Sequence, residues 1–327
     1  MTMELIVLVA AVLAFSWSIG AHYTGACMGM PYGSGSIKLR PALWLMAIFA
    51  LIGATVLSHR VERTVGLSIL ASHRVTLTAA LVIVVAAFVL TTIYTAVKVP
   101  TSTIQILVFC VVGLGLGAGI PVHWLTILKL AAVWVAAPPV ALGLGYLLTH
   151  ALDRLVGFNP APEAAVRQAR VLRTLAVILV AVGAAASLTM GANDVSNATG
   201  VFIMTRQFGV WTAGAIGGLG LLIGVLTWGK PLLNKVAFDV VHVDLSMASA
   251  AQLVQALVVI LAVAFGFFTS MNQALVGAMT GAGLARGQNR IEWRAITNIV
   301  KGWIAGPPSG IVLTFLIAKA AGIWFPL

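Results

Sequence analysis

The sequence is short of charge. Only 8% of its 327 residues are Asp, Glu, Lys or Arg, whereas about a quarter of a soluble domain is charged. Because 61% of the residues are hydrophobic, the chain cannot cover itself with a surface that water wets. Apolar stretches of about 18 residues or more, the length needed to cross roughly 30 Å of hydrocarbon, recur from end to end. The sequence therefore predicts an all-α integral membrane protein, multi-pass in the cell membrane.

Cysteine and catalytic motifs are also scarce. The two cysteines, Cys27 and Cys110, lie in apolar stretches without a CxxC or His partner nearby, so neither a metal cluster nor a disulfide framework is expected. The sequence has no HExxH motif, no P-loop and no candidate Ser-His-Asp set. We therefore expect a protein that is not an enzyme and that needs no cofactor beyond a coupling ion.

The charges that are present are mostly positive. The formal net charge is +11, and the Lys and Arg residues lie mainly between apolar segments. In a membrane protein this pattern indicates basic loops that face the cytoplasm and touch anionic head groups, and it does not indicate a nucleic-acid site. A weak positive field would also favour an anionic solute.

Three stretches of the chain occur twice, in the same order. Residues 20–29 match 191–200 at an offset of 171, residues 101–115 match 269–283 at 168, and residues 134–139 match 303–308 at 169. Collinear matches at a nearly constant offset indicate two homologous halves. We predict a first transmembrane repeat at 1–152, an Arg-rich cytoplasmic connector at 153–172 and a second transmembrane repeat at 173–327.

Each half combines plain apolar runs with two interrupted segments rich in Gly, Ser, Thr or Asn. In the first half the plain runs lie near 4–21, 41–58, 76–97 and 123–149. The interrupted segments are 22–36 and 100–119, with partners at 193–207 and 269–287. Interrupted segments at matching positions of two halves point to the binding site of a transporter. We predict two inverted repeats with broken helices and re-entrant hairpins, about 10–12 membrane segments in all.

The densest polar stretch runs from Met190 to Gly200 and contains Asn193, Asp194 and Asn197. Asp194 is the one acidic residue that we place at membrane depth, because the others lie at chain ends or in polar loops. An ionisable group at the centre of a membrane helix costs at least about 2.5–3.5 kcal/mol, so it marks a functional site. The alternative is that Asn193 or Asp194 caps a half-helix after a break, which would not exclude ligand binding.

Residues 191–198, Gly-Ala-Asn-Asp-Val-Ser-Asn-Ala, resemble the signature of the inorganic phosphate transporter (Pit) family of secondary symporters. The resemblance covers the whole chain, since that family is also built from two homologous halves. It implies inverted repeats whose broken segments meet at a central site for phosphate and for sodium ions or protons. By this resemblance Asn193, Asp194 and Asn197 belong to that site, and residues 101–103 and 269–270 resemble the family's second pair of re-entrant hairpins.

The first half departs from this signature. The family usually repeats the Asn-Asp pair there, but the equivalent positions hold His22 and Tyr23, with Gly25 where Ser196 stands in the second half. The first half has therefore lost its carboxylate. Its sequence is more similar to the branch of the family that contains sulfate permeases, so phosphate and sulfate both stay open as substrates.

The interrupted segments suit a tetrahedral oxyanion. Backbone N–H groups at half-helix starts carry partial positive charge, and nearby side chains can add donors. The alternative for each Ser or Thr alone is hydrogen bonding between helices. Beside the Asn-Asp stretch, the predicted anion- and cation-binding residues are His22, Tyr23, Thr24, Thr101, Ser102, Thr103, Ser196, Thr199, Thr269 and Ser270.

Energetics require coupling. Moving a divalent anion inward against about 100 mV costs roughly 4.6 kcal/mol, at 2.3 kcal/mol per charge. Asp194 is the candidate site for a sodium ion or a proton, and His22 is of a residue type that titrates near neutral pH and could also carry a proton. We predict a phosphate symporter that works by alternating access, in the lipid bilayer and as a candidate homodimer. A sulfate permease and a passive anion channel are the alternatives.

Overall fold

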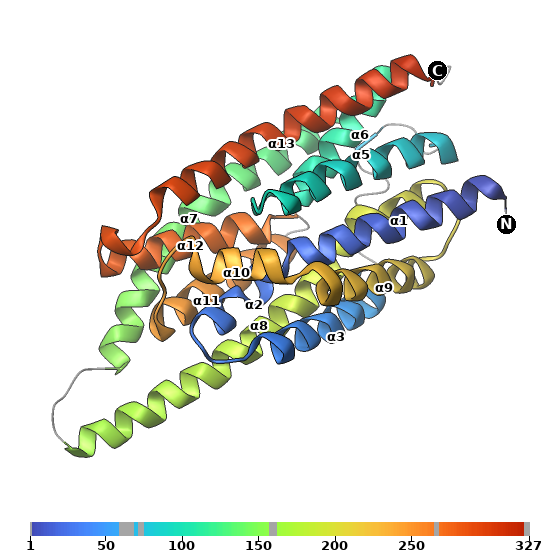
Figure 1. Ribbon diagram of the computed structural model, residues 1–327. Coiled ribbons are helices and arrows are strands. Elements are labelled where there is room, and N and C mark those ends of the chain that lie inside the picture. Colours follow the sequence, from blue (N-terminus) through green and yellow to red (C-terminus); the bar gives the residue numbers. More distant parts are fainter. Residues whose placement is uncertain (1, 59–68, 71–74, 157–161, 265–267, 324–327) are drawn as a thin grey trace.

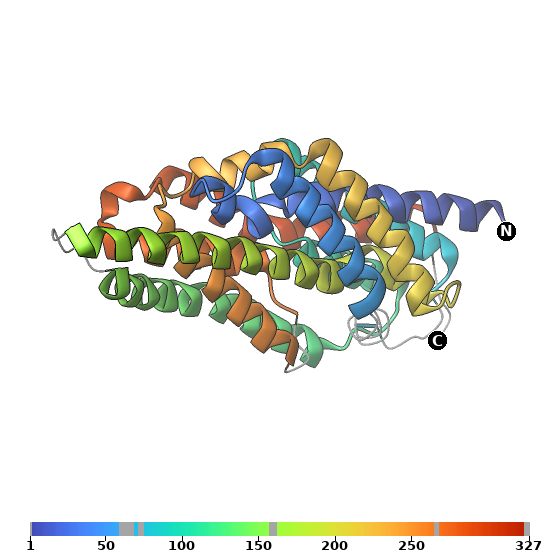
Figure 2. The same ribbon diagram turned by 90° about the horizontal axis from the view of Figure 1, so that it is seen from below.

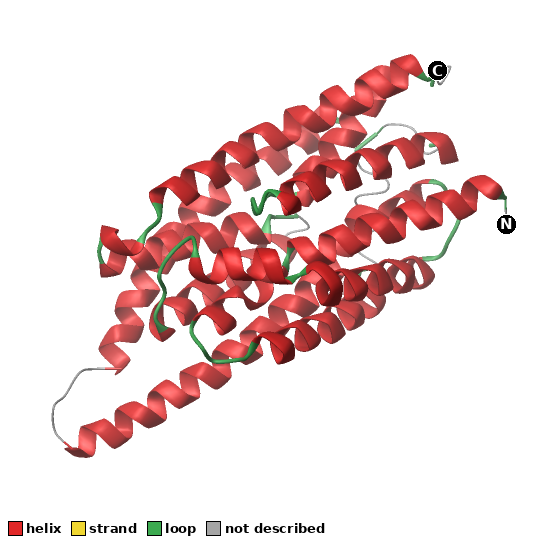
Figure 3. Cartoon of the chain, viewed as in Figure 1, coloured by secondary structure: helices red, strands yellow, loops and turns green. Residues whose placement is uncertain are grey.

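The computed structural model describes residues 2–58, 69–70, 75–156, 162–264 and 268–323. Within these ranges helices are joined by short loops, and no strand is assigned (Figure 3). The helices are α1 (Met3–His22), α2 (Thr24–Gly33), α3 (Leu39–Leu57), α5 (Leu77–Ala96), α6 (Thr103–Ala118), α7 (Trp124–Val156), α8 (Pro162–Met204), α9 (Val210–Trp228), α10 (Lys230–Phe238), α11 (Leu245–Ala264), α12 (Met271–Arg286), the 3-10 helix η1 (Gln288–Arg290) and α13 (Trp293–Ala320).

Eight helical stretches of the described residues are long and apolar enough to cross a membrane, judged by length and composition. One of them combines α1 and α2, and the others lie in α3, α5, α7, α8, α9, α11 and α13. The four plain runs predicted for the first half coincide with α1, α3, α5 and α7. Helix α6 is a shorter apolar helix of 16 residues, and α12 has the same length. The prediction of an all-α, multi-pass membrane protein is confirmed.

The two halves of the chain run in opposite directions. Figures 1 and 2 show both termini at one end of the molecule, here called the terminal end, and the last turn of α7 and the first turn of α8 at the other, here called the connector end. Therefore α1 runs away from the terminal end, whereas α8, which follows the connector, runs toward it. In the same way α7 runs toward the connector end and α13 runs away from it (Figure 1). Counterparts of opposite direction are what inverted repeats require.

The halves also exchange packing partners. Helix α6 packs along α13 and α7 along α12, while α1 packs along α9 and α3 along α8. Glycines allow two of these close approaches at equivalent places: a Cβ on Gly20 would overlap the backbone of Leu221, and a Cβ on Gly191 that of Ala50. The offset of 171 residues relates Gly20 to Gly191 and Ala50 to Leu221, so the two contacts are equivalent. This arrangement fits the predicted duplication, and the exact boundaries of the two repeats stay a prediction.

Helix α8 contradicts one expectation. The sequence predicts a break near Asn193, but α8 continues without interruption from Pro162 to Met204, so neither Asn193 nor Asp194 caps a helix. The physical reason is local, because Ser196 Oγ donates to the Asn193 carbonyl and Thr199 Oγ1 to the Val195 carbonyl, which keeps these hydroxyls inside the helix. The first half does break as predicted.

The break in the first half lies at Tyr23. Helix α1 ends at His22, and Tyr23, with φ −94° and ψ 2°, separates it from α2. Most of the interrupted segment that follows is nevertheless helical, since α2 extends to Gly33. The predicted connector is likewise largely helical, because α7 continues to Val156 and α8 begins at Pro162; residues 157–161 lie outside the described residues.

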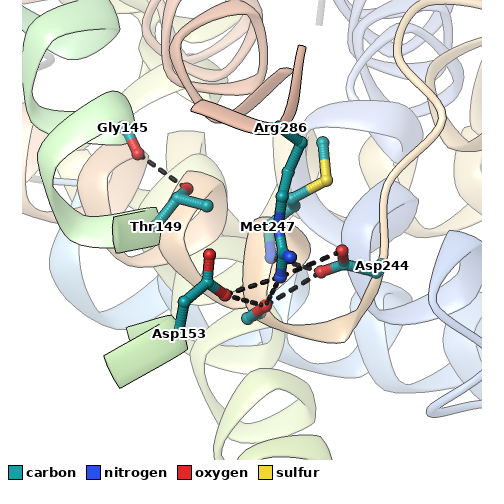
Figure 4. Close-up of polar contacts among 7 residues, drawn as sticks. Gly145, Thr149, Asp153, Asp244, Met247 and Arg286 are labelled. Carbon is teal, nitrogen blue, oxygen red and sulfur yellow. Dashed lines mark hydrogen bonds and ion pairs between the residues drawn. The ribbon is translucent and has the colours of Figure 1, made fainter. Parts of the chain in front are cut away.

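A cluster of ion pairs joins three helix ends near the connector (Figure 4). Arg286, the last residue of α12, contacts the carboxylates of Asp153 on α7 and Asp244 before α11. Ser246 Oγ lies 2.9 Å from an oxygen of each carboxylate. Asp244 also accepts the Met247 N–H at 3.0 Å and so caps α11. The cluster closes the base of the hairpin formed by α11 and α12.

We predict that Gly224→Ala destabilises the helix body. A Cβ at Gly224 on α9 would overlap the carbonyl oxygen of Trp17 on α1, so the two helices must separate. Overpacking of this kind costs about 1–3 kcal/mol, more than the roughly 1 kcal/mol that Ala gains over Gly inside a helix. The variant should lose its monodisperse, folded form at a lower temperature than the parent chain in detergent.

Gly143→Ala is the matched control. Gly143 lies inside α7, and a Cβ there meets nothing within 4 Å. The midpoint temperature of unfolding of this variant should therefore equal that of the parent or be slightly higher. Equal midpoints for the Gly224 variant and the parent would show that α1 and α9 do not depend on this close contact.

Candidate functional site

Two hairpin tips meet in the middle of the molecule. Helices α5 and α6 lie toward the terminal end of the molecule, and α11 and α12 lie toward the connector end (Figure 1). Their tips are residues 101–103 before and at the start of α6, and residues 269–272 before and at the start of α12. Asn272 Nδ2 donates to the Thr101 carbonyl at 2.7 Å. The side-chain amides of Gln105 and Gln273 exchange two hydrogen bonds of 3.2 Å each.

Both helices begin at a serine. Ser102 Oγ accepts the Gln105 N–H at 3.4 Å, and Ser270 Oγ accepts the Gln273 N–H at 3.3 Å, so each serine is the N-cap of its helix. Each hydroxyl keeps its own proton as a donor. The first N–H groups of a helix have no partner within it and carry partial positive charge. Two buried helix starts therefore present donors to the same region.

The break at Tyr23 faces the polar stretch of α8. Tyr23 Oη lies 3.1 Å from Thr103 Oγ1, and Asn197 Nδ2 donates to the same Thr103 oxygen at 2.9 Å. The Tyr23 hydroxyl also contacts the Asp194 carboxylate. A consistent order of donors runs from Asn197 to Thr103, from Thr103 to Tyr23 and from Tyr23 to Asp194. The network thus ends on the carboxylate, and Tyr23 stands where the offset of 171 would place a second Asp.

This network leaves acceptors in excess. Asp194 is 1% exposed, and its oxygens accept only long hydrogen bonds of 3.5 Å from Asn193 and Asn197 in addition to the Tyr23 contact. The amide oxygens of Asn193 and Asn197 are buried and have no hydrogen-bond partner. Carboxylate and amide oxygens are the ligands that hard cations prefer. The described residues contain no group of three or more His, Cys, Asp or Glu that would suit a transition metal.

His22 is fully engaged. The Thr101 N–H donates to His22 Nε2 at 3.0 Å, and Nδ1 lies 2.8 Å from Thr95 Oγ1, which itself donates to the Thr91 carbonyl. These contacts are satisfied together by a neutral ring with its proton on Nδ1, an assignment made from the hydrogen-bond network. His22 therefore ties the end of α1 to α5 and to the tip before α6, which favours a positioning role over proton transfer.

The structure brings together most of the predicted residues but not all of them. Thr24 Oγ1 donates to the carbonyls of Ala21 and Gly229, which secures the turn between α9 and α10. Ser196 and Thr199 bond to the backbone of α8, as described above. Thr269 Oγ1 is buried at the second tip and has no hydrogen-bond partner. The ligand-binding role of every predicted residue stays a prediction.

Sequence reasoning missed the two glutamines. Gln105 and Gln273 lie at equivalent positions of the matching stretches 101–115 and 269–283, and a polar residue at the same place in both halves is a usable signal. They border a cavity of about 390 Å³ between α7 and α13. Trp134 and Trp303 also line it and donate to the Phe268 and Pro100 carbonyls at 3.0 and 2.9 Å. These two hydrogen bonds join α7 to the residue before the second tip and α13 to the residue before the first tip.

We predict that the two glutamines are energetically coupled. Gln105→Leu or Gln273→Leu alone leaves one buried amide without its partner, which costs about 1–3 kcal/mol. The double variant removes both amides, so its loss of thermal stability should be clearly smaller than the sum of the two single losses. The measurement is a double-mutant cycle of thermal midpoints in detergent, with exposed Gln207→Leu as control. Additive losses would show that the pair is not a unit.

Known proteins resemble this chain in sequence. The family model described as "Phosphate transporter family" matches residues 19–314. The chain is 26% identical over 311 residues to "Sulfate permease CysP" of Bacillus subtilis (strain 168), covering 94% of this chain and 85% of that protein. It is 23% identical over an alignment of 407 residues to "Inorganic phosphate transporter 2-1, chloroplastic" of Arabidopsis thaliana, covering 92% and 69%.

A solved structure supports the fold. The protein named "The sodium-dependent phosphate transporter" aligns with a TM-score of 0.87 and 21% identity, over 98% of this chain and 100% of that chain. At this identity the likeness concerns the fold alone.

Proposed function

Since the chain belongs to the phosphate transporter family, whose model matches residues 19–314, we propose that it imports inorganic phosphate by symport with a cation. The family confirms the resemblance found at residues 191–198, and it is a family of membrane transporters and not of enzymes. The observation that carries the proposal is the buried carboxylate of Asp194 beside the two meeting helix starts.

The anion binds between the hairpin tips. Free N–H groups at the starts of α6 and α12, with the Ser102 and Ser270 hydroxyls, offer donors from two sides to the oxygens of a tetrahedral anion. Thr103 and Tyr23 add hydroxyls on the side of α8. Because the site is buried, little water screens the attraction between these N–H and O–H groups and the anion.

The cation binds at Asp194. The Asp194 carboxylate and the unpartnered amide oxygens of Asn193 and Asn197 offer oxygen ligands from three residues to a sodium ion, and the carboxylate alone can take a proton. A bound cation would neutralise Asp194 and remove its repulsion of an anion at the tips, which couples the two binding events. Tyr23 fills the place of a second carboxylate, so fewer fixed cation sites are expected than in a relative with two.

Access alternates between the two ends. One hairpin enters from each end, and the two tips are joined by the hydrogen bond from Asn272 and by those between Gln105 and Gln273. Movement of one hairpin away from the other can therefore expose the site to one side of the membrane at a time. We place the connector end in the cytoplasm, because Arg154, Arg170, Arg286 and Arg294 lie at or near the helix ends there.

Sulfate is the second candidate substrate, supported by the 26% identity to a sulfate permease and by the altered first half. Phosphate is preferred for a chemical reason. Near neutral pH phosphate carries at least one O–H donor and sulfate carries none, and the Thr269 hydroxyl, buried without a partner at the second tip, can accept that hydrogen bond.

The test is uptake of labelled phosphate and labelled sulfate into proteoliposomes, under an imposed proton gradient and then a sodium gradient. We expect phosphate to accumulate with one of the gradients, which names the cation. Asp194→Asn should lower accumulation roughly 5- to 150-fold, the range of a typical coupling free energy of 1–3 kcal/mol. Glu4→Gln, exposed at the start of α1, is the control and should transport normally.

Each other outcome has a definite meaning. Accumulation of sulfate alone would assign the chain to the second substrate. Phosphate flux that ignores both cation gradients would replace symport by a passive channel. Normal accumulation by Asp194→Asn would remove the carboxylate from the coupling site.

A further inference from the structure

A second polar cavity lies outside the transport site, near the connector end. Its volume is about 350 Å³, and it is lined by residues of α10, of the segment after it and of the first turns of α13. Two backbone hydrogen bonds fix this segment, from His242 N–H to the Arg290 carbonyl at 2.9 Å and from Glu292 N–H to the Val240 carbonyl at 3.1 Å. The cavity is therefore framed by a rigid backbone.

Two exposed aromatic residues lie at the cavity, as is usual at a membrane interface. Trp293, the first residue of α13, is 47% exposed, and Phe238, at the end of α10, is 44% exposed. Trp side chains gather where hydrocarbon meets head groups. The Phe238 ring lines the cavity itself, so an apolar surface adjoins its charged groups.

Each of the two walls of the cavity offers a cation. Arg294 on α13 has no carboxylate partner among the described residues, and Asn298 lies one turn further along the same face. Lys235 faces the cavity from α10, and its ammonium is 3.5 Å from Asp239. An Arg fork, a Lys and a carboxamide from two walls suit the oxygens of a phosphate group.

Each wall also offers a carboxylate, Asp239 beside Lys235 and Glu292 just before Arg294. The side chains of Asp239 and Glu292 are 59% and 55% exposed. Among the described residues Asp239 pairs with Lys235, and Glu292 has one close contact, with His242 Nε2 at 3.4 Å, which is an ion pair only when that ring is protonated. Carboxylates accept several hydrogen bonds each, so both can accept further donors from a ligand. The two formal positive charges of Lys235 and Arg294 are balanced by these two negative charges.

From this balance we propose that the cavity binds the head group of a zwitterionic phospholipid with a primary ammonium, such as phosphatidylethanolamine. The phosphate lies between Arg294, Lys235 and Asn298, the ammonium donates to Asp239 and Glu292, and the acyl chains leave past Phe238. A free phosphate dianion would meet two carboxylates and no excess positive charge, which disfavours it. The bound lipid would link α10 to α13 on the connector side.

The test is native mass spectrometry of the purified chain with phosphatidylethanolamine, phosphatidylcholine or phosphatidylglycerol at equal concentrations. We expect preferential retention of phosphatidylethanolamine, because the quaternary ammonium of phosphatidylcholine has no N–H and phosphatidylglycerol has no ammonium. Arg294→Gln should weaken this retention roughly tenfold, the effect of losing a charge-assisted hydrogen bond. Arg290→Gln, in the neighbouring η1 and outside the cavity lining, is the matched control and should bind as the parent does.

A second variant tests the ammonium. Asp239→Asn should weaken binding of phosphatidylethanolamine while leaving phosphatidylglycerol unchanged or slightly tighter. The proposal is overturned if Arg294→Gln and Arg290→Gln bind equally, if the three lipids bind equally, or if inorganic phosphate displaces the lipid and so identifies a free-anion site. None of these results depends on transport activity.

Discussion

The structure depends on keeping a carboxylate inside an apolar body. An acidic group at the centre of a membrane helix costs several kcal/mol unless donors or a cation compensate it. Asp194 is 1% exposed on a helix that does not break there. Its compensation comes from elsewhere in the chain, above all from Tyr23 at the break between α1 and α2. The break, the tips and the carboxylate therefore form one unit.

The opposite directions of the two parts of the chain explain how distant segments reach this unit. Each half begins at one end of the molecule and finishes at the other, so the two hairpins enter from opposite ends and meet tip to tip. Small residues such as Gly20 and Gly191 allow backbones to approach closely, as is usual where lipid gives no hydrophobic drive for helix association. The exchanged pairs hold both halves together around a site that neither half could build alone.

Much of this was predictable from the sequence. Apolar run lengths gave the membrane helices, and the repeat offsets placed residues 101–103 and 269–270 at equivalent tips. The continuity of α8 was not predictable, because Asn and Asp favour both helix caps and ligand sites, and only the structure shows one helix from Pro162 to Met204 in which Ser196 and Thr199 bond to the backbone. The engagement of both nitrogens of His22 depends on Thr95 and Thr101, more than seventy positions away. The joining of Asp153, Asp244 and Arg286 likewise needs three dimensions.

The central claim is that cation and anion bind together because Asp194 and the helix starts face one region. The most direct measurement is equilibrium binding of labelled phosphate to the purified chain, with and without the coupling cation, in the parent and in Asp194→Asn. The account predicts that the cation tightens phosphate binding to the parent, and that Asp194→Asn binds phosphate with an affinity that no longer depends on the cation. Unchanged cation dependence in Asp194→Asn would contradict it.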